Sequence, residues 1–208
     1  MKSNPTILVF GASGQMGTFL MEYLTNTNLS IKAFVRKPEN FEFKAAKNVQ
    51  CIQGDATDLE AIKIAMEDVD IVVSCLGNPK GKYIMATANE NIMLAASAQN
   101  KAPKCLMISS IGLGGSSWFV KSLLTLIAGK QAIKDGEQAD KIVREQTDVP
   151  FILIRPAGLT NKAESNYRII QKSSIFFPKF MSRKGVAKFL IDNLLQETYL
   201  NKAVLIQG

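Results

Sequence analysis

The sequence predicts an α/β protein built on a doubly wound parallel sheet, and three observations support this. Short apolar runs alternate with longer amphipathic stretches along the 208 residues, which is the pattern of consecutive βαβ units. The apolar runs are continuous and do not alternate with polar residues, as expected for strands that helices cover on both faces. A glycine-rich turn, residues 11–17, lies between the first apolar run and the first amphipathic stretch.

Each expected strand is a short run rich in Val, Ile, Leu or Phe. In chain order, the strands are expected at Ile7–Phe10, Ile31–Val35, Val49–Gln53, Asp70–Ser74, Lys104–Ser109, Pro150–Ile154 and Ala203–Ile206. Helices are expected between them, where apolar residues recur at a longer period. These are Thr18–Leu24, Leu59–Met66, Ile84–Ala98, Ile133–Glu145 and Arg183–Leu195, and Asp58 is the expected N-cap of the second.

The remaining segments have less pattern. No linker or repeat divides the chain, so a single domain is expected over residues 1–208. Residues 112–128 are first rich in glycine and then apolar, which favours a flap or, at Trp118–Ile127, a surface for a protein partner. Residues 161–181 show little regularity and are expected to form a small C-terminal cap over the sheet edge.

Composition excludes several classes of site. Apolar residues make up 47% and charged residues 21% of the chain, as in an ordinary globular protein. The chain has no histidine, which removes Ser-His-Asp and Cys-His catalysis and zinc sites built on histidine. The three cysteines, Cys51, Cys75 and Cys105, lie far apart. Neither a disulfide framework nor a metal site is therefore expected, and a reducing, cytoplasmic location fits best.

No targeting or membrane-spanning segment is expected. The apolar run Ile7–Phe10 is too short for a signal peptide, and Lys121 interrupts the apolar stretch from Trp118 to Ala128. The net charge of +7 favours anionic partners, which include phosphorylated cofactors. No nucleic-acid-binding motif occurs, so nucleic acid is not an expected partner and the basic residues are interpreted as a solvated surface. The oligomeric state is not indicated by the sequence.

The turn Gly11-Ala12-Ser13-Gly14-Gln15-Met16-Gly17 is the strongest functional signal. Glycines let the backbone turn tightly and approach a pyrophosphate, while the N-terminus of the following helix attracts its negative charge. The spacing GxxGxxG is a variant of the dinucleotide-binding pattern, and its place between a strand and a helix supports that function. The alternative is a glycine-rich turn that binds nothing.

The end of the second strand favours NADP(H) over NAD(H). NAD sites place Asp or Glu there, about 20 residues after the turn, to hold the ribose 2′-hydroxyl. This chain has Arg36 and Lys37 instead, and its next carboxylate is Glu39. Arginine can pair with a 2′-phosphate through two parallel hydrogen bonds, and Lys37 adds positive charge. The alternative is that both side chains are merely exposed after a strand.

Two further strand ends are expected to line the same crevice, because ligands bind at the carboxyl ends of parallel strands. Gly54 and Gly77 follow the third and fourth strands and would let the backbone approach a flat ring. Asp55 can accept a hydrogen bond from an adenine amino group, or it can be an ordinary turn carboxylate. Cys75 is interpreted as a small core residue rather than a reactive thiol.

Taken together, these motifs resemble those of the atypical short-chain dehydrogenases/reductases. They are GASGQMG at 11–17, FVRKP at 34–38, GDATD at 54–58, MISSIG at 107–112, FILIRPAGLT at 151–160 and MSRKGVA at 181–187. Within that family they are most similar to the branch of NmrA-like and biliverdin reductase B or flavin reductase-like proteins. The resemblance covers nearly the whole chain and implies a Rossmann-like, NAD(P)-binding fold.

The resemblance also implies roles for individual residues. Those implied to hold the pyrophosphate lie in the glycine turn and include Ser13, Gln15 and Met16. Those implied for the 2′-phosphate, adenine and ribose lie at the next three strand ends and are Arg36, Asp55, Ala56, Leu76 and Gly77. Those implied around the nicotinamide, with one face of its ring left open to a substrate, are Ser109, Ser110, Pro156, Ala157 and Leu159.

The chain departs from the family pattern at the catalytic pair. Classical members carry Tyr-x-x-x-Lys, in which tyrosine supplies a proton and lysine lowers its pKa and holds the ribose. None of the four tyrosines in this chain has lysine four residues later. Lys134, in the expected helix, could hold ribose or phosphate, or it could be an exposed helix lysine. Carbonyl reduction by a tyrosine acid is therefore poorly supported.

Reduction of a flavin, a quinone or a similar flat acceptor asks less of the protein, because the proton can come from water. Ser109 could orient the nicotinamide amide or the acceptor, or it could only satisfy a strand end. The sequence thus predicts an NADPH-dependent oxidoreductase of a small flat acceptor, with Ser109 as the candidate catalytic residue. The alternatives are a non-catalytic NADP(H)-binding redox sensor that acts through a protein partner, and an isomerase or reductase of one specialised metabolite.

Overall fold

The computed structural model describes residues 4–78, 82–113, 122, 125–126, 128–162, 166–170 and 179–208. The strands are β1 (Thr6–Phe10), β2 (Ser30–Val35), β3 (Val49–Gln53), β4 (Ile71–Ser74), β5 (Lys104–Ile108), β6 (Phe151–Pro156), β7 (Leu159–Thr160), β8 (Arg168–Ile170), β9 (Met181–Ser182) and β10 (Lys202–Gln207). The helices are α1 (Gln15–Leu24), α2 (Leu59–Met66), α3 (Met85–Ser97), α5 (Lys130–Glu145) and α6 (Arg183–Asn193), with a 3₁₀ turn η1 at Pro38–Asn40.

The described residues form an eight-stranded sheet in the order β3-β2-β1-β4-β5-β6-β10-β8. Neighbouring strands run parallel except for β8, which lies antiparallel to β10 at the edge. The chain moves outward from β1 to β3, then returns and moves outward again from β4 on the other side of β1. This reversal makes a doubly wound, Rossmann-like sheet and confirms the predicted fold class.

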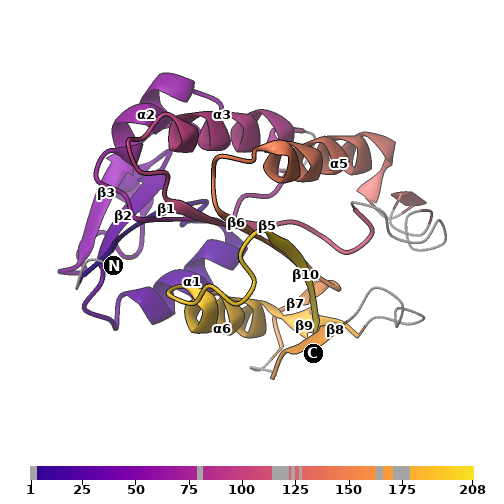
Figure 1. Cartoon of the computed structure of the whole chain (residues 1–208). Coiled ribbons are helices and arrows are strands. Elements are labelled where there is room, and N and C mark those ends of the chain that lie inside the picture. The colour runs from indigo at the N-terminus through magenta and orange to yellow at the C-terminus, as the bar shows by residue number, and fades with distance from the viewer. Residues whose placement is uncertain are drawn as a thin grey trace.

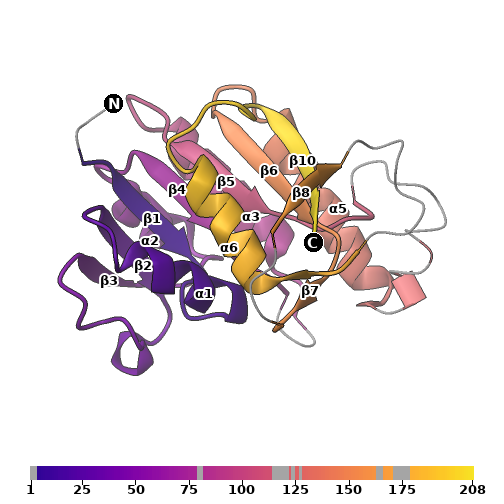
Figure 2. The same cartoon turned by 90° about the horizontal axis from the view of Figure 1, so that it is seen from below.

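Helices cover both faces of the sheet, with α2, α3 and α5 on one face and α1 and α6 on the other (Figure 1). Figure 2 shows α1 and α6 side by side across the second face. The side chains of β1 alternate between two cores: Ile7 and Val9 pack on the side of α1 and α6, whereas Leu8 and Phe10 pack on the side of α2 and α3. Because both faces are buried, the strand is a continuous apolar run.

Local sequence signals set where the helices begin. Asp58 accepts hydrogen bonds from the backbone N–H groups of Glu60 and Ala61 at 3.0 and 3.2 Å, which confirms it as the N-cap of α2. Ser182 caps α6 in the same way through the N–H of Gly185 at 2.9 Å. Helix α1 begins at Gln15, directly after β1 and its glycine turn, so its N-terminus lies at the carboxyl edge of the sheet.

Three short strands, β7, β8 and β9, are not among the strands that the sequence predicts. β7 pairs with β9, and β8 pairs with β10. Each of the three is two or three residues long, which is too short for a hydrophobic period to reveal. β8 and the first residue of β9 belong to the segment expected to form the cap, and β7 directly precedes it. Residues 163–165 and 171–178 of that segment lie outside the described part of the chain.

The segment expected as a flap or partner surface is described only in part. Residues 114–121, 123–124 and 127, and with them most of Trp118–Ile127, lie outside the described residues. Within the part that the structure covers, no helix is long and apolar enough to cross a membrane.

Candidate functional site

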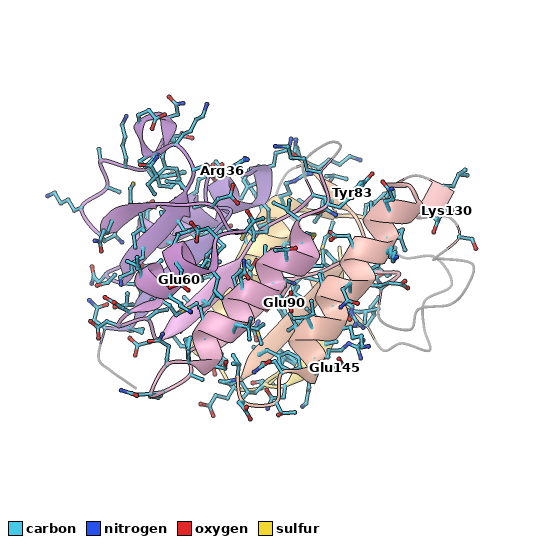
Figure 3. The ribbon with its side chains drawn as sticks, turned by 90° about the horizontal axis from the view of Figure 1, so that it is seen from above. Arg36, Glu60, Tyr83, Glu90, Lys130 and Glu145 are labelled. Carbon is cyan, nitrogen blue, oxygen red and sulfur yellow. The ribbon has the colours of Figure 1, made fainter. Side chains whose placement is uncertain are left out.

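A cavity of about 850 Å³ lies along the carboxyl edge of the sheet, over the ends of strands β1 to β6. Figure 3 looks down on α3 and α5 and shows Arg36, Tyr83 and Lys130 toward one edge of the molecule, with Glu145 at the opposite end of α5. Most of the residues predicted from the sequence line the cavity. They are Gly11, Ser13, Gly14, Gln15, Met16, Arg36, Asp55, Ala56, Leu76, Gly77, Ser109, Ser110, Pro156 and Leu159.

The other predicted site residues, Gly17, Lys37, Lys134 and Ala157, do not line the cavity. Lys37 and Lys134 are exposed, so Lys134 has the position of an exposed helix lysine. Ala157 is buried with Ile111 and Leu205, behind the lining residue Pro156. Gly17 lies within α1 under the glycine turn.

The glycine turn has the tight geometry that a phosphate cradle requires. Gly11 has φ +70°, and a Cβ there would meet the backbone carbonyl carbon of Cys75 at 2.9 Å. A Cβ on Gly17 would lie 2.1 Å from the carbonyl oxygen of Gly11, so glycine lets α1 pack closely on the turn. A Cβ on Gly14 would meet only that oxygen, at 3.2 Å, and Gly14 lines the cavity. The turn and the α1 N-terminus therefore fit a dinucleotide pyrophosphate.

Opposite charges lie at the ends of β2 and β3. Arg36 is exposed and lines the cavity. Asp55 Oδ1 accepts hydrogen bonds from the backbone N–H and the hydroxyl of Thr57, at 2.9 and 2.7 Å. These bonds, with smaller contributions from the positive charges of Arg36 and Lys82, lower the pKa of Asp55 below its ordinary value. Asp55 thus closes its turn as an ionised carboxylate while it also lines the cavity.

A pair of polar side chains that sequence reasoning missed lies beyond the end of β4. Asn78 Nδ2 donates to Asp135 Oδ2 at 2.8 Å, and Asp135 also accepts from the backbone N–H groups of Met85 and Ala86 at 3.1 and 3.2 Å. Asp135 therefore caps the N-terminus of α3 from α5. Because Asn78 and Met85 both line the cavity, the hydrogen bonds of Asp135 to these two residues hold part of the cavity wall in place.

The thiol at the end of β4 belongs to Cys75. Cys75 lines the cavity but is buried, and burial raises the pKa of its thiol to about 12. This agrees with its interpretation as a core residue. Among the described residues, no group of three or more His, Cys, Asp or Glu side chains is placed to hold a metal ion.

Helix α5 presents small and apolar residues to the cavity. Ala132, Ile133 and Gly136 line it, and a Cβ on Gly136 would meet Leu113 Cδ1 at 2.9 Å. Ala132 and Gly136 are four residues apart, which is the spacing of Tyr-x-x-x-Lys on one helix face. No tyrosine among the described residues lines the cavity. The described residues of this wall therefore include no tyrosine–lysine pair, and the Leu113 side chain occupies the space next to Gly136.

A buried charged network stands behind Ser109. The Ser109 hydroxyl donates to Asp140 Oδ1 at 2.9 Å. Asp140, from α5, is fully buried and also pairs with the buried Arg155 at 2.6 Å and with the half-buried Arg144 at 2.9 Å. Sequence reasoning missed this network. Two signals point to it: Asp140 lies on the buried face of α5, and Arg155 interrupts the apolar run of β6.

Comparison with curated proteins gives distant relatives over most of the chain. An uncharacterised chloroplastic protein of Arabidopsis thaliana is 25% identical over 220 residues, covering 96% of this chain and 75% of that protein. The chloroplastic divinyl chlorophyllide a 8-vinyl-reductase of the same plant is 23% identical over 97% of this chain and 53% of its own length. The chain thus spans about half the length of that reductase.

Solved structures share the fold. ChuY, an anaerobilin reductase of Escherichia coli O157:H7, matches with a TM-score of 0.80 at 20% identity, over 97% of this chain and 96% of its own. A short-chain dehydrogenase/reductase of Veillonella parvula, solved in complex with NADP, matches with a TM-score of 0.79 at 19% identity, over 98% and 94%. A family model described as NAD(P)H-binding matches residues 11–197. As its sequence motifs predict, this chain belongs to the NAD(P)H-binding family.

Proposed function

We propose that this protein binds NADP(H) and transfers a hydride from NADPH to a flat, conjugated acceptor such as a flavin or a quinone. The observation that carries the proposal is the composition of the cavity. Its lining combines a glycine cradle and Arg36 with small side chains on α5 and with no described group suited to act as an acid. The reductases among the similar proteins support reduction as the class of reaction.

The order of the strands supports different roles for the two ends of the cavity. A pyrophosphate on the turn after β1 would sit at the reversal between β1 and β4. The adenosine half would then extend over β2 and β3, toward Arg36 and Asp55. The nicotinamide half would extend over β4, β5 and β6, toward Ser109 and Pro156. Arg36 would thereby lie at the 2′-phosphate, where it favours NADP(H).

When bound, NADPH supplies a hydride, which is two electrons and one proton. Complete reduction of the acceptor needs one further proton, and a flavin or a quinone can take it from water after the hydride has arrived. The task of the chain is then to hold the two rings face to face, with the reacting atoms roughly 3–3.5 Å apart. The small side chain of Ala132, which lines the cavity, would leave room for the second ring.

The described lining favours such an acceptor over a carbonyl that requires an acid. The Ser109 hydroxyl donates its hydrogen bond to Asp140, and the Ser110 hydroxyl donates its hydrogen bond to the carbonyl oxygen of Ile111. The Cys75 thiol, with a pKa of about 12, is a poor acid at neutral pH. The two lining arginines, Arg36 and Arg183, are fixed charges. Water is thus the proposed source of the proton.

The choice of cofactor is tested at Arg36. Arg36→Ala is expected to weaken NADPH binding by about tenfold or more and to leave NADH binding nearly unchanged, since a charge-assisted hydrogen bond is worth about 1.5–3 kcal/mol. Calorimetric titration of both nucleotides measures this. Lys37→Ala is the matched variant and should have a smaller effect, because Lys37 does not line the cavity. An equal loss for NADPH and NADH at Arg36→Ala would contradict the assignment.

The source of the proton is tested by the dependence of turnover on pH. Turnover number with a quinone is expected to vary little between about pH 7 and 9, above the second pKa of a phosphate monoester. Asp55 stays ionised there because the hydrogen bonds from Thr57 lower its pKa from 3.8, and Cys75 stays protonated because burial raises its pKa to about 12. A fall of about tenfold per pH unit in this range would instead indicate a side-chain acid.

A further inference from the structure

The buried carboxylate of Asp140 is saturated with hydrogen bonds. Its Oδ1 accepts from the Ser109 hydroxyl at 2.9 Å and from Arg155 Nε and Nη2 at 3.0 and 2.9 Å. Its Oδ2 accepts from Arg155 Nη2 at 2.6 Å and from Arg144 Nε at 2.9 Å. The side chain has no exposed surface. Both oxygens are therefore held in place, and the two arginines balance the buried charge.

This network fixes the direction of the hydrogen bond at Ser109. A carboxylate can only accept hydrogen bonds, so the Ser109 hydroxyl must donate its one hydrogen bond to Asp140. The Ser109 oxygen then has only lone pairs to offer to a ligand in the cavity. Any polar group that meets it there must be a donor, an N–H or an O–H.

Ser109 is also the member of the network that reaches the cavity. Ser109 lines the cavity, whereas Asp140, Arg144 and Arg155 are not part of its described lining. The neighbouring Ser110 has no comparable carboxylate, because its hydroxyl bonds to the backbone carbonyl of Ile111 at 3.1 Å. The buried Asp140–Arg155 pair, with the half-buried Arg144, can thus act on a ligand in the cavity through the Ser109 oxygen.

We propose that Asp140 is a positioning residue that holds Ser109 as a hydrogen-bond acceptor for the carboxamide NH₂ group of the nicotinamide. The carboxamide offers an N–H donor at the end of the cavity where β5 and β6 terminate. Accepting this bond would fix the rotation of the carboxamide and, with it, the face of the ring turned toward the acceptor. The inference rests on the proposed function for the place of the nicotinamide, and it needs no turnover to be tested.

The test compares two nucleotides that differ only in this donor. In the 3-acetylpyridine analogue of NADP⁺, a methyl ketone replaces the carboxamide, so it has no N–H to give. The ratio of the dissociation constants of analogue and NADP⁺ is expected to be above one for the unsubstituted protein. Ser109→Ala should lower this ratio by about two- to tenfold, the usual effect of one hydrogen bond. An unchanged ratio in Ser109→Ala would overturn the proposal.

The role of Asp140 is separated from that of Ser109 by a double-variant cycle. Asp140→Asn should lower the same ratio, because an amide can donate to Ser109 and so release the serine proton toward the cavity. In the Ser109→Ala background, Asp140→Asn should change the ratio no further. An equal additional fall in that background would show that Asp140 acts elsewhere. A loss of affinity common to both nucleotides would reveal only a structural effect and would count against the proposal.

A control variant and a check of folding accompany the measurement of this ratio. Lys141→Ala, the next residue of α5, changes an exposed pair with Glu145 and should leave the ratio unchanged. Circular dichroism and thermal unfolding check that each variant is folded. Where Asp140→Asn fails to fold, Ser109→Ala with the two nucleotides still decides the contact at Ser109. Failure of the unsubstituted protein to bind either nucleotide would overturn the proposed function as well, whereas absent turnover with an intact ratio would overturn only the reductase activity.

Discussion

Gly14→Val is expected to abolish dinucleotide binding while the chain stays folded. Gly14 has an extended backbone with φ −82° and ψ 167°, which valine can adopt. A Cβ there would meet only the Gly11 carbonyl oxygen, at 3.2 Å, and Gly14 lines the cavity, so the added methyl groups are expected to enter the cavity. In the proposed complex, the backbone would approach the pyrophosphate at this place. Calorimetry with NADPH and circular dichroism measure the two effects separately.

Gly17→Ala is the matched control in the same turn. Its Cβ would lie 2.1 Å from the carbonyl oxygen of Gly11 and 2.7 Å from the Cα of Ala12, which are both backbone atoms that cannot turn away. The main loss there should therefore be in the free energy of unfolding. Undiminished NADPH affinity in folded Gly14→Val protein would mean that the turn is not the binding site.

Asp140→Ala is expected to lower the free energy of unfolding by about 3–5 kcal/mol, the usual cost of leaving a buried charge without its partner. Arg155 is 3% exposed and would be left without the carboxylate that it now contacts through two nitrogens. Urea unfolding followed by circular dichroism measures the change.

The double variant Asp140→Leu with Arg155→Met tests the explanation. It removes both buried charges, and apolar side chains of similar volume can replace a buried ion pair at little cost. Arg144 is 42% exposed and can turn toward water. The double variant should therefore be more stable than Asp140→Ala. If it loses as much stability, the charge of Arg155 is not the cause.

The fold could be predicted because its signals are local. Each parallel strand is an apolar run, and the glycine turn, the cap at Asp58 and the position of Arg36 all follow from residues close together in the chain. Their assembly at one edge then follows from the topology, because parallel strands end on the same side. For this reason most of the predicted residues line a single cavity.

The network behind Ser109 could not be predicted in the same way. Ser109, Asp140 and Arg155 come from β5, α5 and β6, and no spacing in the sequence indicates that they meet. Lys134 is a residue that the sequence offered as a possible ligand of ribose or phosphate and that does not line the cavity. It lies in the expected helix, but the helical period turns its side chain toward solvent. The cytoplasmic location, the single domain over residues 1–208 and a protein partner rest on sequence patterns and stay predictions.

Oxidation of NADPH by the unsubstituted protein, measured with a flavin, a quinone and a linear tetrapyrrole under identical conditions, tests the central claim most directly. We expect that at least one of these flat acceptors is reduced and that NADH is used less well than NADPH. Tyr83→Phe should leave the rate nearly unchanged, since Tyr83 does not line the cavity. Tight binding of NADPH without oxidation by any of the acceptors would contradict the account and favour a non-catalytic NADP(H) sensor.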